Sequence, residues 1–314
     1  MQSKLIVTPA PHITRNYTTL TLMFAMAIAL IPQIVSGVFN LGVRALYVVI
    51  IAVGSAYVFD LLLKLCKKEK IDWADISSIV TGMMIGCVLP VSVPLYIPII
   101  ASFLAVVVFK GCFGGVGKNI FNPTAAARVV LGLVFAGLTL EWFKGTSVVL
   151  GENVASPIEY LAKGDYSIIT LRSLFFGTAP GAIGTVSMLC ILISGIVLMC
   201  FGITNFVLPV CSILTYVIVI WISKGSVAVL PYLFSGSFMF ASMFMLTDPT
   251  TSPNTLWGKL VFALIFGVIA GLFRCFNVLG ETSVFVALLI VNVLSPLLDK
   301  IFAPRPLGLK RRVK

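Results

Sequence analysis

The sequence contains little charge. Only 11% of its 314 residues are Asp, Glu, Lys or Arg, whereas 59% are hydrophobic and the mean hydropathy is +1.11. Soluble domains carry about 25% charged residues. This composition excludes a soluble domain and indicates an all-α, polytopic membrane protein, because a β-barrel would show short alternating segments instead of long apolar runs.

The residues used in metal and hydrolytic sites are also scarce. The chain has one histidine, His12, and its seven cysteines form no C-x-x-C pair. Disulfides, a zinc site and a catalytic triad are therefore not expected. The first residues lack the apolar core and cleavage site of a secretory signal, so we expect no removable signal peptide.

The net charge of +11 comes partly from two basic clusters, 64–70 and 310–314. Both clusters lie next to apolar runs, as expected for topology signals and contacts with anionic lipid. This distribution indicates a lipid membrane as partner and argues against nucleic acid.

Long apolar runs predict about ten transmembrane helices. A run of about 20 apolar residues can cross a bilayer. The stretch 74–92 is the weakest, because polar residues dilute it and Pro90 ends it, so it could be a broken or re-entrant helix. The predicted spans are 17–39, 43–65, 74–92, 95–113, 123–141, 182–202, 205–222, 229–247, 258–276 and 282–302.

The distribution of Lys and Arg predicts the topology. With the N-terminus inside, fifteen of these residues fall on the inner side and six on the outer side. This asymmetry predicts that both termini are cytoplasmic. The chain is then a single integral membrane domain, 1–314, with a long outer-face loop at 142–180.

The two halves of the chain share a weak pattern. In each, a span rich in small residues ends in a Pro-rich turn, another span follows, and a polar break precedes the last span. Five spans is an odd number, so the pattern predicts two inverted five-helix repeats with broken helices. A transporter or channel with no redox cofactor would fit this fold equally well.

The stretch GGVGKNIFNPTAAARVV, 114–130, raises the question of a phosphate loop. A Walker loop ending at Lys118 needs glycine at Cys112 and a hydroxyl at Asn119, so that motif is excluded. The stretch instead predicts a turn, then a helix capped by Asn122 with proline at its first position. Arg128 then lies within the membrane, where an arginine costs about 2.5–3.5 kcal/mol unless it is paired or hydrated.

Three buried charges are therefore candidates for ion coupling or for structural pairing. Arg128 could pair with a buried acid such as Asp248 or Glu281, or could serve an anionic cofactor or ion path. Asp248, in LTDPTTSP, is either a helix terminator or part of an oxygen-rich cation entry with its neighbouring threonines. Glu281 could simply stabilise a helix N-terminus.

Six segments in order resemble the RnfD/NqrB family of membrane subunits, which occur in the Rnf complex and in the sodium-translocating NADH:quinone reductase. The resemblance covers nearly the whole chain. The segments are TPAPHI, VSGVFNLGVRAL, DISSIVTGMMIGCVLP, GGVGKNIFNPTAAARVVL, FFGTAPGAIGTVS and LTDPTTSPNT.

The resemblance implies a membrane redox subunit of an ion-translocating ferredoxin:NAD oxidoreductase, not catalytic alone. Such a subunit lies in a bacterial or archaeal cytoplasmic membrane, carries electrons through an FMN on the outer side, and is coupled to Na⁺ or H⁺ movement. The implied partners are the other Rnf proteins: a membrane iron–sulfur pair, the outer flavoprotein RnfG, and the cytoplasmic RnfB and RnfC.

Family members attach FMN through a phosphoester to threonine in a D-x-x-[ST]-G-A-T-P-like motif. The best counterpart is LGENVASPI, 150–158, where Ser156 takes the position of the threonine but the preceding residues depart from the motif. The resemblance thus leaves three alternatives: covalent FMN at Ser156, a non-covalent flavin (FMN or riboflavin), or no flavin. The expected binding residues are Ser156, Asn153, Pro157, Tyr160, Arg172, Phe176 and Thr178.

Overall fold

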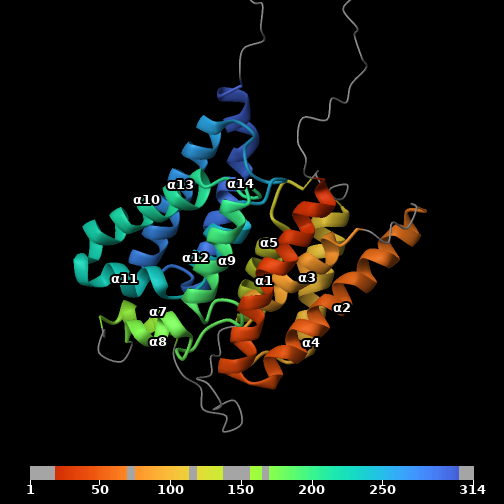
Figure 1. The fold of residues 1–314 in the computed structure, drawn as a ribbon, viewed down its shortest axis with the longest axis horizontal. Coiled ribbons are helices and arrows are strands. Elements are labelled where there is room, and N and C mark those ends of the chain that lie inside the picture. The colour runs from red at the N-terminus through yellow and green to blue at the C-terminus, as the bar shows by residue number, and fades with distance from the viewer. Residues whose placement is uncertain (1–17, 69–74, 113–118, 137–155, 165–169, 304–314) are drawn as a thin grey trace, which may run out of the picture.

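The secondary structure is helical. A computed structural model describes residues 18–68, 75–112, 119–136, 156–164 and 170–303, and within these ranges it contains helices and one isolated β-bridge but no strand. The helices form two groups, one from each half of the chain (Figure 1). The prediction of an all-α polytopic membrane protein is confirmed.

The first half supplies five helical segments, and two short helices follow it. The segments of the first half are α1 (Thr19–Leu41), α2 (Val43–Cys66), α3 (Ser77–Val88), α4 (Tyr96–Phe103) continued by the π-helix η1 (Leu104–Gly111), and α5 (Pro123–Val134). The short helices are α7 (Pro157–Ala162) and α8 (Leu171–Phe176).

The second half supplies another five segments in the same order. They are α9 (Met188–Cys200), α10 (Val207–Lys224), α11 (Ser226–Phe234) with α12 (Phe238–Phe240) and the π-helix η3 (Ala241–Met245), α13 (Leu256–Cys275), and the 3₁₀ turn η4 (Gly280–Thr282) leading into α14 (Ser283–Ile301). Each of the ten predicted spans overlaps one of the ten segments.

Several segments are too short to cross a bilayer alone. Five helices of the described chain are long and apolar enough, and a pair bent by 67°, Ser226–Phe234 with Phe238–Met245, makes six. A 12-residue helix such as α3 or α5 is about 18 Å long at 1.5 Å per residue, against a hydrocarbon core of about 30 Å. The helix in the predicted span 74–92 is thus shorter than a full span, which agrees with the expectation of broken helices, and α5 ends at Val134, before the described residues stop at 136.

Helices in equivalent positions of the two halves run antiparallel. Near the start of α1, Leu22 lines the same cavity as Ile203, which follows α9, whereas further along α1 the Gln33 amide donates to the Cys190 carbonyl at the start of α9. Likewise α5 packs against α14 in the opposite direction. This arrangement is what an inverted repeat requires.

The bundle has two distinct ends. Thr19, at the start of α1, and Asp299, near the end of α14, line one cavity, so the start of α1 and the end of α14 lie at the same end of the bundle, here named the terminal end. Helices α7 and α8 lie at the opposite end, here named the loop end (Figure 1). There the Asn40 amide at the end of α1 donates to the Phe176 carbonyl at 3.4 Å.

Small residues allow close helix contacts. Gly267 and Gly271 on α13 form a G-x-x-x-G pair that faces α10, and a Cβ on Gly267 would lie 2.5 Å from the Ser212 carbonyl oxygen. Gly82 and Gly86 on α3 face α2 in the same way. In a membrane, where lipid competes for apolar side chains, such close contacts are a main source of helix association.

We predict that Gly267→Ala destabilises the protein and lowers its unfolding midpoint in detergent. The neighbouring atom is a backbone carbonyl oxygen that cannot rotate away, so we expect a cost of about 1–3 kcal/mol. Gly54→Ala on α2 is the control, because a Cβ there meets nothing within 4 Å. Equal midpoints for the two variants would contradict the close packing of α10 on α13.

Candidate functional site

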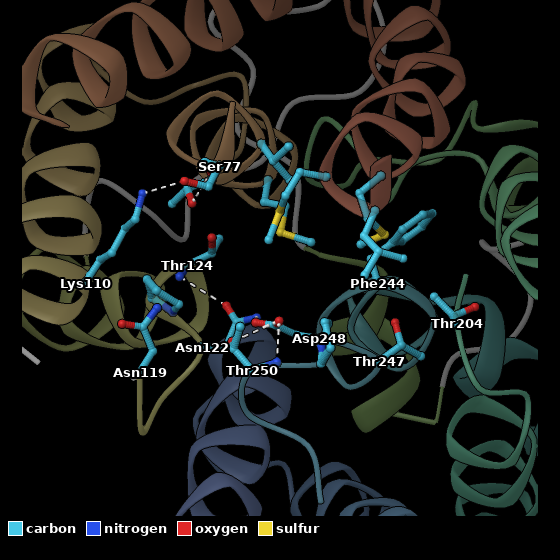
Figure 2. A pocket seen from close by; sticks show the side chains of 18 of the residues that line it. Ser77, Lys110, Asn119, Asn122, Thr124, Thr204, Phe244, Thr247, Asp248 and Thr250 are labelled. Atoms are coloured by element: carbon cyan, nitrogen blue, oxygen red, sulfur yellow. Dashed lines mark hydrogen bonds between the residues drawn. The ribbon is translucent and has the colours of Figure 1, made fainter. Parts of the chain in front are cut away.

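A pocket at the terminal end lies between the two halves of the chain. Its volume is about 80 Å³, several times the roughly 10–15 Å³ that one water needs on the same measure. Its walls come from α1, α3, η1, the start of α5, the turn after α9, and the end of η3 (Figure 2). It is named the inner pocket below.

One wall of the inner pocket is polar, and local sequence explains its shape. The Asn122 side chain caps α5 by accepting from the N–H groups of Thr124 and Ala125 at 3.1 and 3.2 Å. The predicted Asn-Pro helix start is therefore confirmed. Its amide nitrogen faces Asp248 Oδ2 at 3.5 Å, so two of the predicted residues, far apart in sequence, lie side by side.

Asp248 is held by the turn that ends the broken span. Its Oδ1 accepts from the N–H and the hydroxyl of Thr250, at 3.1 and 2.9 Å. Burial raises the pKa of the Asp248 carboxyl, although these two bonds oppose the shift. A carboxyl in this state can bind a cation or accept a proton, as well as terminate the helix.

The polar wall also contains a buried hydrogen-bond acceptor, the side-chain oxygen of Asn119. Asn119 Oδ1 is buried at the pocket, and within the described part of the chain no donor reaches it. A buried carbonyl oxygen without a donor costs about 1–3 kcal/mol. A ligand with an N–H or O–H group would satisfy it.

Much of the remaining lining of the inner pocket is apolar. It includes Met23, Met26, Met84 and Phe244, with both sulfur and aromatic surfaces available to a flat ligand. Figure 2 shows Phe244 and the labelled polar residues arranged around the open centre. Thioether and ring contacts of this kind are favourable for aromatic systems.

The two π-helices deliver polar residues to the inner pocket. Lys110 lies near the end of η1, and Thr247 and Asp248 follow directly after η3. An extra residue per turn rotates the following side chains relative to an α-helix, and π segments frequently mark functional sites. The topology prediction used Lys110 only as one of the fifteen inner-side cations. A lysine inside an apolar span was the signal that could have identified it as a pocket residue.

A second buried cluster lies toward the loop end. Glu281 pairs with Arg274 at 3.2 Å and accepts from the Ser237 hydroxyl at 3.3 Å. Arg274 is one of the six cations that the topology prediction places on the outer side. In the structure it is buried, with 1% of its surface exposed. The structural role predicted for Glu281 thus includes a buried ion pair, with Arg274 as partner.

Arg128 is buried beside this cluster. Its Nε donates to the Val88 carbonyl at 3.2 Å, and its guanidinium lies 5.9 Å from the centre of the Phe285 ring. These contacts come from the end of α3 and from α14, so Arg128 ties the two halves together. A role for Arg128 in ion coupling stays a prediction.

The residues predicted to bind flavin in the outer loop lie in different environments. Ser156 is 2% exposed and caps α7: its Oγ accepts from the Glu159 N–H at 3.3 Å, and its hydroxyl donates to Glu159 Oε1 at 3.3 Å. Pro157 is buried and Tyr160 half-buried, whereas Arg172, Phe176 and Thr178 are exposed. Asn153 lies outside the described residues, and none of the others lines the inner pocket.

Comparison with known proteins identifies the family. The model of the NQR2, RnfD, RnfE family matches residues 6–308. The chain belongs to this family. It is 29% identical to the D subunit of the proton-translocating ferredoxin:NAD(+) oxidoreductase complex of Clostridium ljungdahlii, over 97% of this chain and 96% of that protein. It is 30% identical to the D subunit of the Na(+)-translocating ferredoxin:NAD(+) oxidoreductase complex of Acetobacterium woodii, over 98% and 96%.

Family membership confirms the resemblance seen in the ordered segments. One relative is named as proton-translocating and the other as Na⁺-translocating. Similarity at this level therefore does not tell which ion accompanies this chain. The buried ion pair and the inner pocket are features of the described structure and are independent of these names.

We predict that Glu281→Ala destabilises the protein strongly. Its removal leaves the buried Arg274 without a carboxylate, and breaking a buried pair costs about 3–5 kcal/mol. A double-mutant cycle with Arg274→Ala, followed by unfolding in detergent, checks this. We expect the double variant to lose much less stability than the sum of the single losses, and additive losses would contradict the pairing.

Proposed function

We propose that this chain is the membrane redox subunit of an Rnf-type ferredoxin:NAD⁺ oxidoreductase complex. It passes electrons through a bound flavin and is coupled to Na⁺ or H⁺ movement. The observation that carries the proposal is the family match over 6–308, because the named relatives align over nearly their whole length. This coverage supports a subunit equivalent to those of the relatives, rather than a fragment shared with them.

The inner pocket supports non-covalent binding of a flavin. A flavin ring has two flat apolar faces and an edge of N–H and carbonyl groups. Met84 and Phe244 can contact the faces, whereas Asn119, Asn122 and Thr124 can bond the edge. The buried Asn119 oxygen without a donor is the feature that fits an N–H group of the ring.

The charges around the inner pocket favour a flavin without phosphate. Lys110 is the cation in its lining, and its Nζ already contacts the oxygens of Asp60, Ser77 and Ser78. Asp248 adds a carboxylate that would repel a phosphate. We therefore propose riboflavin, rather than FMN, for this pocket.

An FMN at the loop end is the second flavin location that we propose to test. Arg172 is exposed there and could contact a phosphate. Covalent attachment at Ser156 would require the hydroxyl to leave the α7 cap, where it is buried. This cost favours non-covalent over covalent FMN.

The residues of the inner pocket would bind and orient the flavin and exclude water. A flavin supplies one- and two-electron transfer when bound. We propose that the terminal end faces the cytoplasm, in line with the Lys and Arg asymmetry. The pocket would then lie near the cytoplasmic side. The proposed partners of the subunit as a whole are the membrane iron–sulfur pair, RnfB and RnfC on the cytoplasmic side, and RnfG on the outer side.

A transporter or channel without a redox cofactor is the alternative function. The inverted repeat and a second cavity at the terminal end, lined by Thr250 and Asn254 among others, are compatible with it. This alternative predicts that the folded subunit, once separated from the other subunits of the intact complex, is colourless.

We predict that Met84→Trp lowers the riboflavin content of the purified complex at least several-fold. The indole would fill the inner pocket, which Met84 lines. Met83→Trp is the control, because Met83 lies on the same helix but does not line the pocket. Riboflavin is separated from FMN after denaturation and measured by absorbance, and an unchanged riboflavin content in a folded Met84→Trp complex would exclude this pocket.

We predict that the flavin is released by denaturation and that Ser156→Ala leaves its amount unchanged. The variant loses a helix cap worth about 1 kcal/mol. Fluorescence in a denaturing gel and the mass of the peptide 145–165 report covalent attachment. An FMN-phosphate mass on Ser156 in the native protein, absent in Ser156→Ala, would replace the non-covalent proposal for the loop end.

A further inference from the structure

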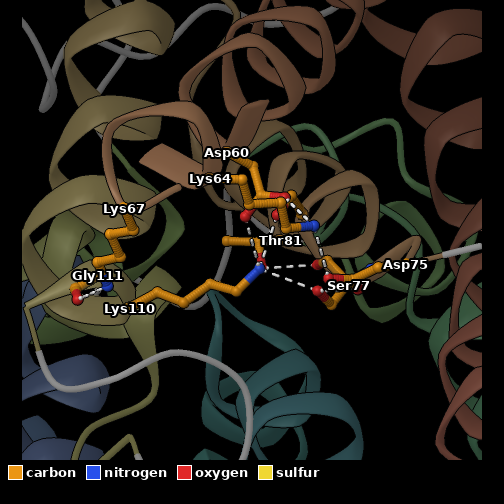
Figure 3. A network of polar contacts seen from close by, with 9 residues as sticks. Asp60, Lys64, Lys67, Asp75, Ser77, Thr81, Lys110 and Gly111 are labelled. Carbon is orange, nitrogen blue, oxygen red and sulfur yellow. Dashed lines mark hydrogen bonds and ion pairs between the residues drawn. The ribbon is translucent and has the colours of Figure 1, made fainter. Parts of the chain in front are cut away.

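A closed ring of polar contacts lies beside the inner pocket (Figure 3). Lys110 Nζ contacts Asp60 Oδ1 at 3.3 Å, and Asp60 Oδ2 contacts Lys64 Nζ at 2.7 Å. Lys64 Nζ contacts Asp75 Oδ2 at 3.0 Å, and the Ser77 hydroxyl donates to Asp75 Oδ1 at 2.5 Å. Lys110 Nζ donates to the Ser77 oxygen at 2.9 Å and so completes the ring.

Exposure increases around this ring from the pocket toward solvent. The side chains of Lys110 and Asp60 are 6% and 9% exposed, that of Lys64 is 15% exposed, and that of Asp75 is 25% exposed. Lys110 and Ser77 line the inner pocket. The ring is therefore a continuous hydrogen-bonded connection between the pocket and the terminal end.

The charges in the ring balance. Two ammonium groups, Lys110 and Lys64, face two carboxylates, Asp60 and Asp75, and across the pocket lies Asp248. Loss of a proton from Lys110 would leave an uncompensated negative charge in a buried place. Such a charge is costly, so the deprotonated ring would take up a proton again.

We propose that Lys110 donates a proton to the heteroaromatic ring bound in the inner pocket and regains it from the terminal end through Ser77 and Asp75. This proposal rests on the proposed function. An iron–sulfur partner supplies the electron. One of the three Lys110 N–H groups, which otherwise donate to Asp60, Ser77 and Ser78, turns to the acceptor, and its N–H bond breaks as an N–H bond forms on the acceptor. A hydronium ion at the terminal end first protonates the Asp75 carboxylate, leaving water. Asp75 then passes this proton to the Ser77 oxygen as the Ser77 hydroxyl turns and gives its own proton to the neutral amine.

The properties of Asp75 suit transfer rather than storage. Asp75 precedes α3, and burial raises its pKa, but bonds from Ser77 and Lys64 outweigh burial and hold the pKa at about 2. A proton that reaches Asp75 is therefore passed on to a stronger base. A neutral lysine amine is such a base.

A purely structural ring is the competing explanation, because it also ties α2, α3 and η1 together. Both explanations predict some loss of stability when Lys110 is removed. Only proton donation predicts that a small amine in solution restores the rate. Lys67 provides a matched control, since its Nζ donates to the Gly111 carbonyl at 2.8 Å, next to Lys110 but outside the ring (Figure 3).

The test uses the intact purified complex with Lys110→Ala and, as control, Lys67→Ala. A flash-activated reductant delivers the electron, flavin absorbance follows reduction, and a pH indicator follows proton uptake. We expect Lys110→Ala to retain flavin but to slow both signals about 100-fold, within the range for a positioned general acid. Ammonium and methylammonium should restore them in proportion to concentration, and Lys67→Ala should leave them unchanged.

The outcomes separate this proposal from the proposed function. A folded, flavin-loaded Lys110→Ala complex with unchanged proton uptake, or with slow uptake that no amine restores, overturns the role of Lys110. If Lys110→Ala does not fold, Ser77→Ala keeps all four charges and should slow proton uptake alone, and an unchanged rate there overturns the proposal. A native complex without flavin in the inner pocket overturns the proposed function itself, and this proposal with it.

Discussion

Every charge that this protein places at membrane depth needs a partner within the protein, because the hydrocarbon offers no water. The described residues meet this constraint in two places. Toward the loop end, Glu281 pairs with Arg274, beside Arg128. Toward the terminal end, Lys110 joins the ring that contains Asp60. These two clusters contain the ion pairs described above, whereas Asn122 and Asp248 form a separate polar group at the inner pocket.

Interrupted helices place polar groups between the two halves. A continuous helix satisfies its own backbone and presents only side chains, whereas a helix that begins or ends within the bundle also provides caps and turns. Asn122 at the start of α5 and Asp248 after η3 meet in this way from opposite halves. The inverted repeat therefore explains why a pocket forms here, and the π segments explain why Lys110 and Asp248 border it.

Local patterns in the sequence predicted much of the fold. The apolar runs located all ten helical segments, and the Asn-Pro pair located the start of α5. Contacts between distant residues were not predictable in the same way, since Asp60 and Lys110 are 50 positions apart. Ser156 shows a different difficulty, because the same serine fits the threonine position of the flavin-attachment motif and the first position of a helix-capping pattern. In the structure it caps α7. The spacing of apolar residues along the sequence did not distinguish the π-helices from α-helices.

The central claim is that a flavin without phosphate lies in the inner pocket, near the terminal end. A cryo-electron microscopy map of the intact complex, purified without added flavin, tests it most directly. We expect density for a flat three-ring system between Met84 and Phe244, with its edge against Asn119 and no density for a phosphate. A pocket filled by protein side chains or water alone, with flavin density elsewhere in this subunit, would contradict the claim.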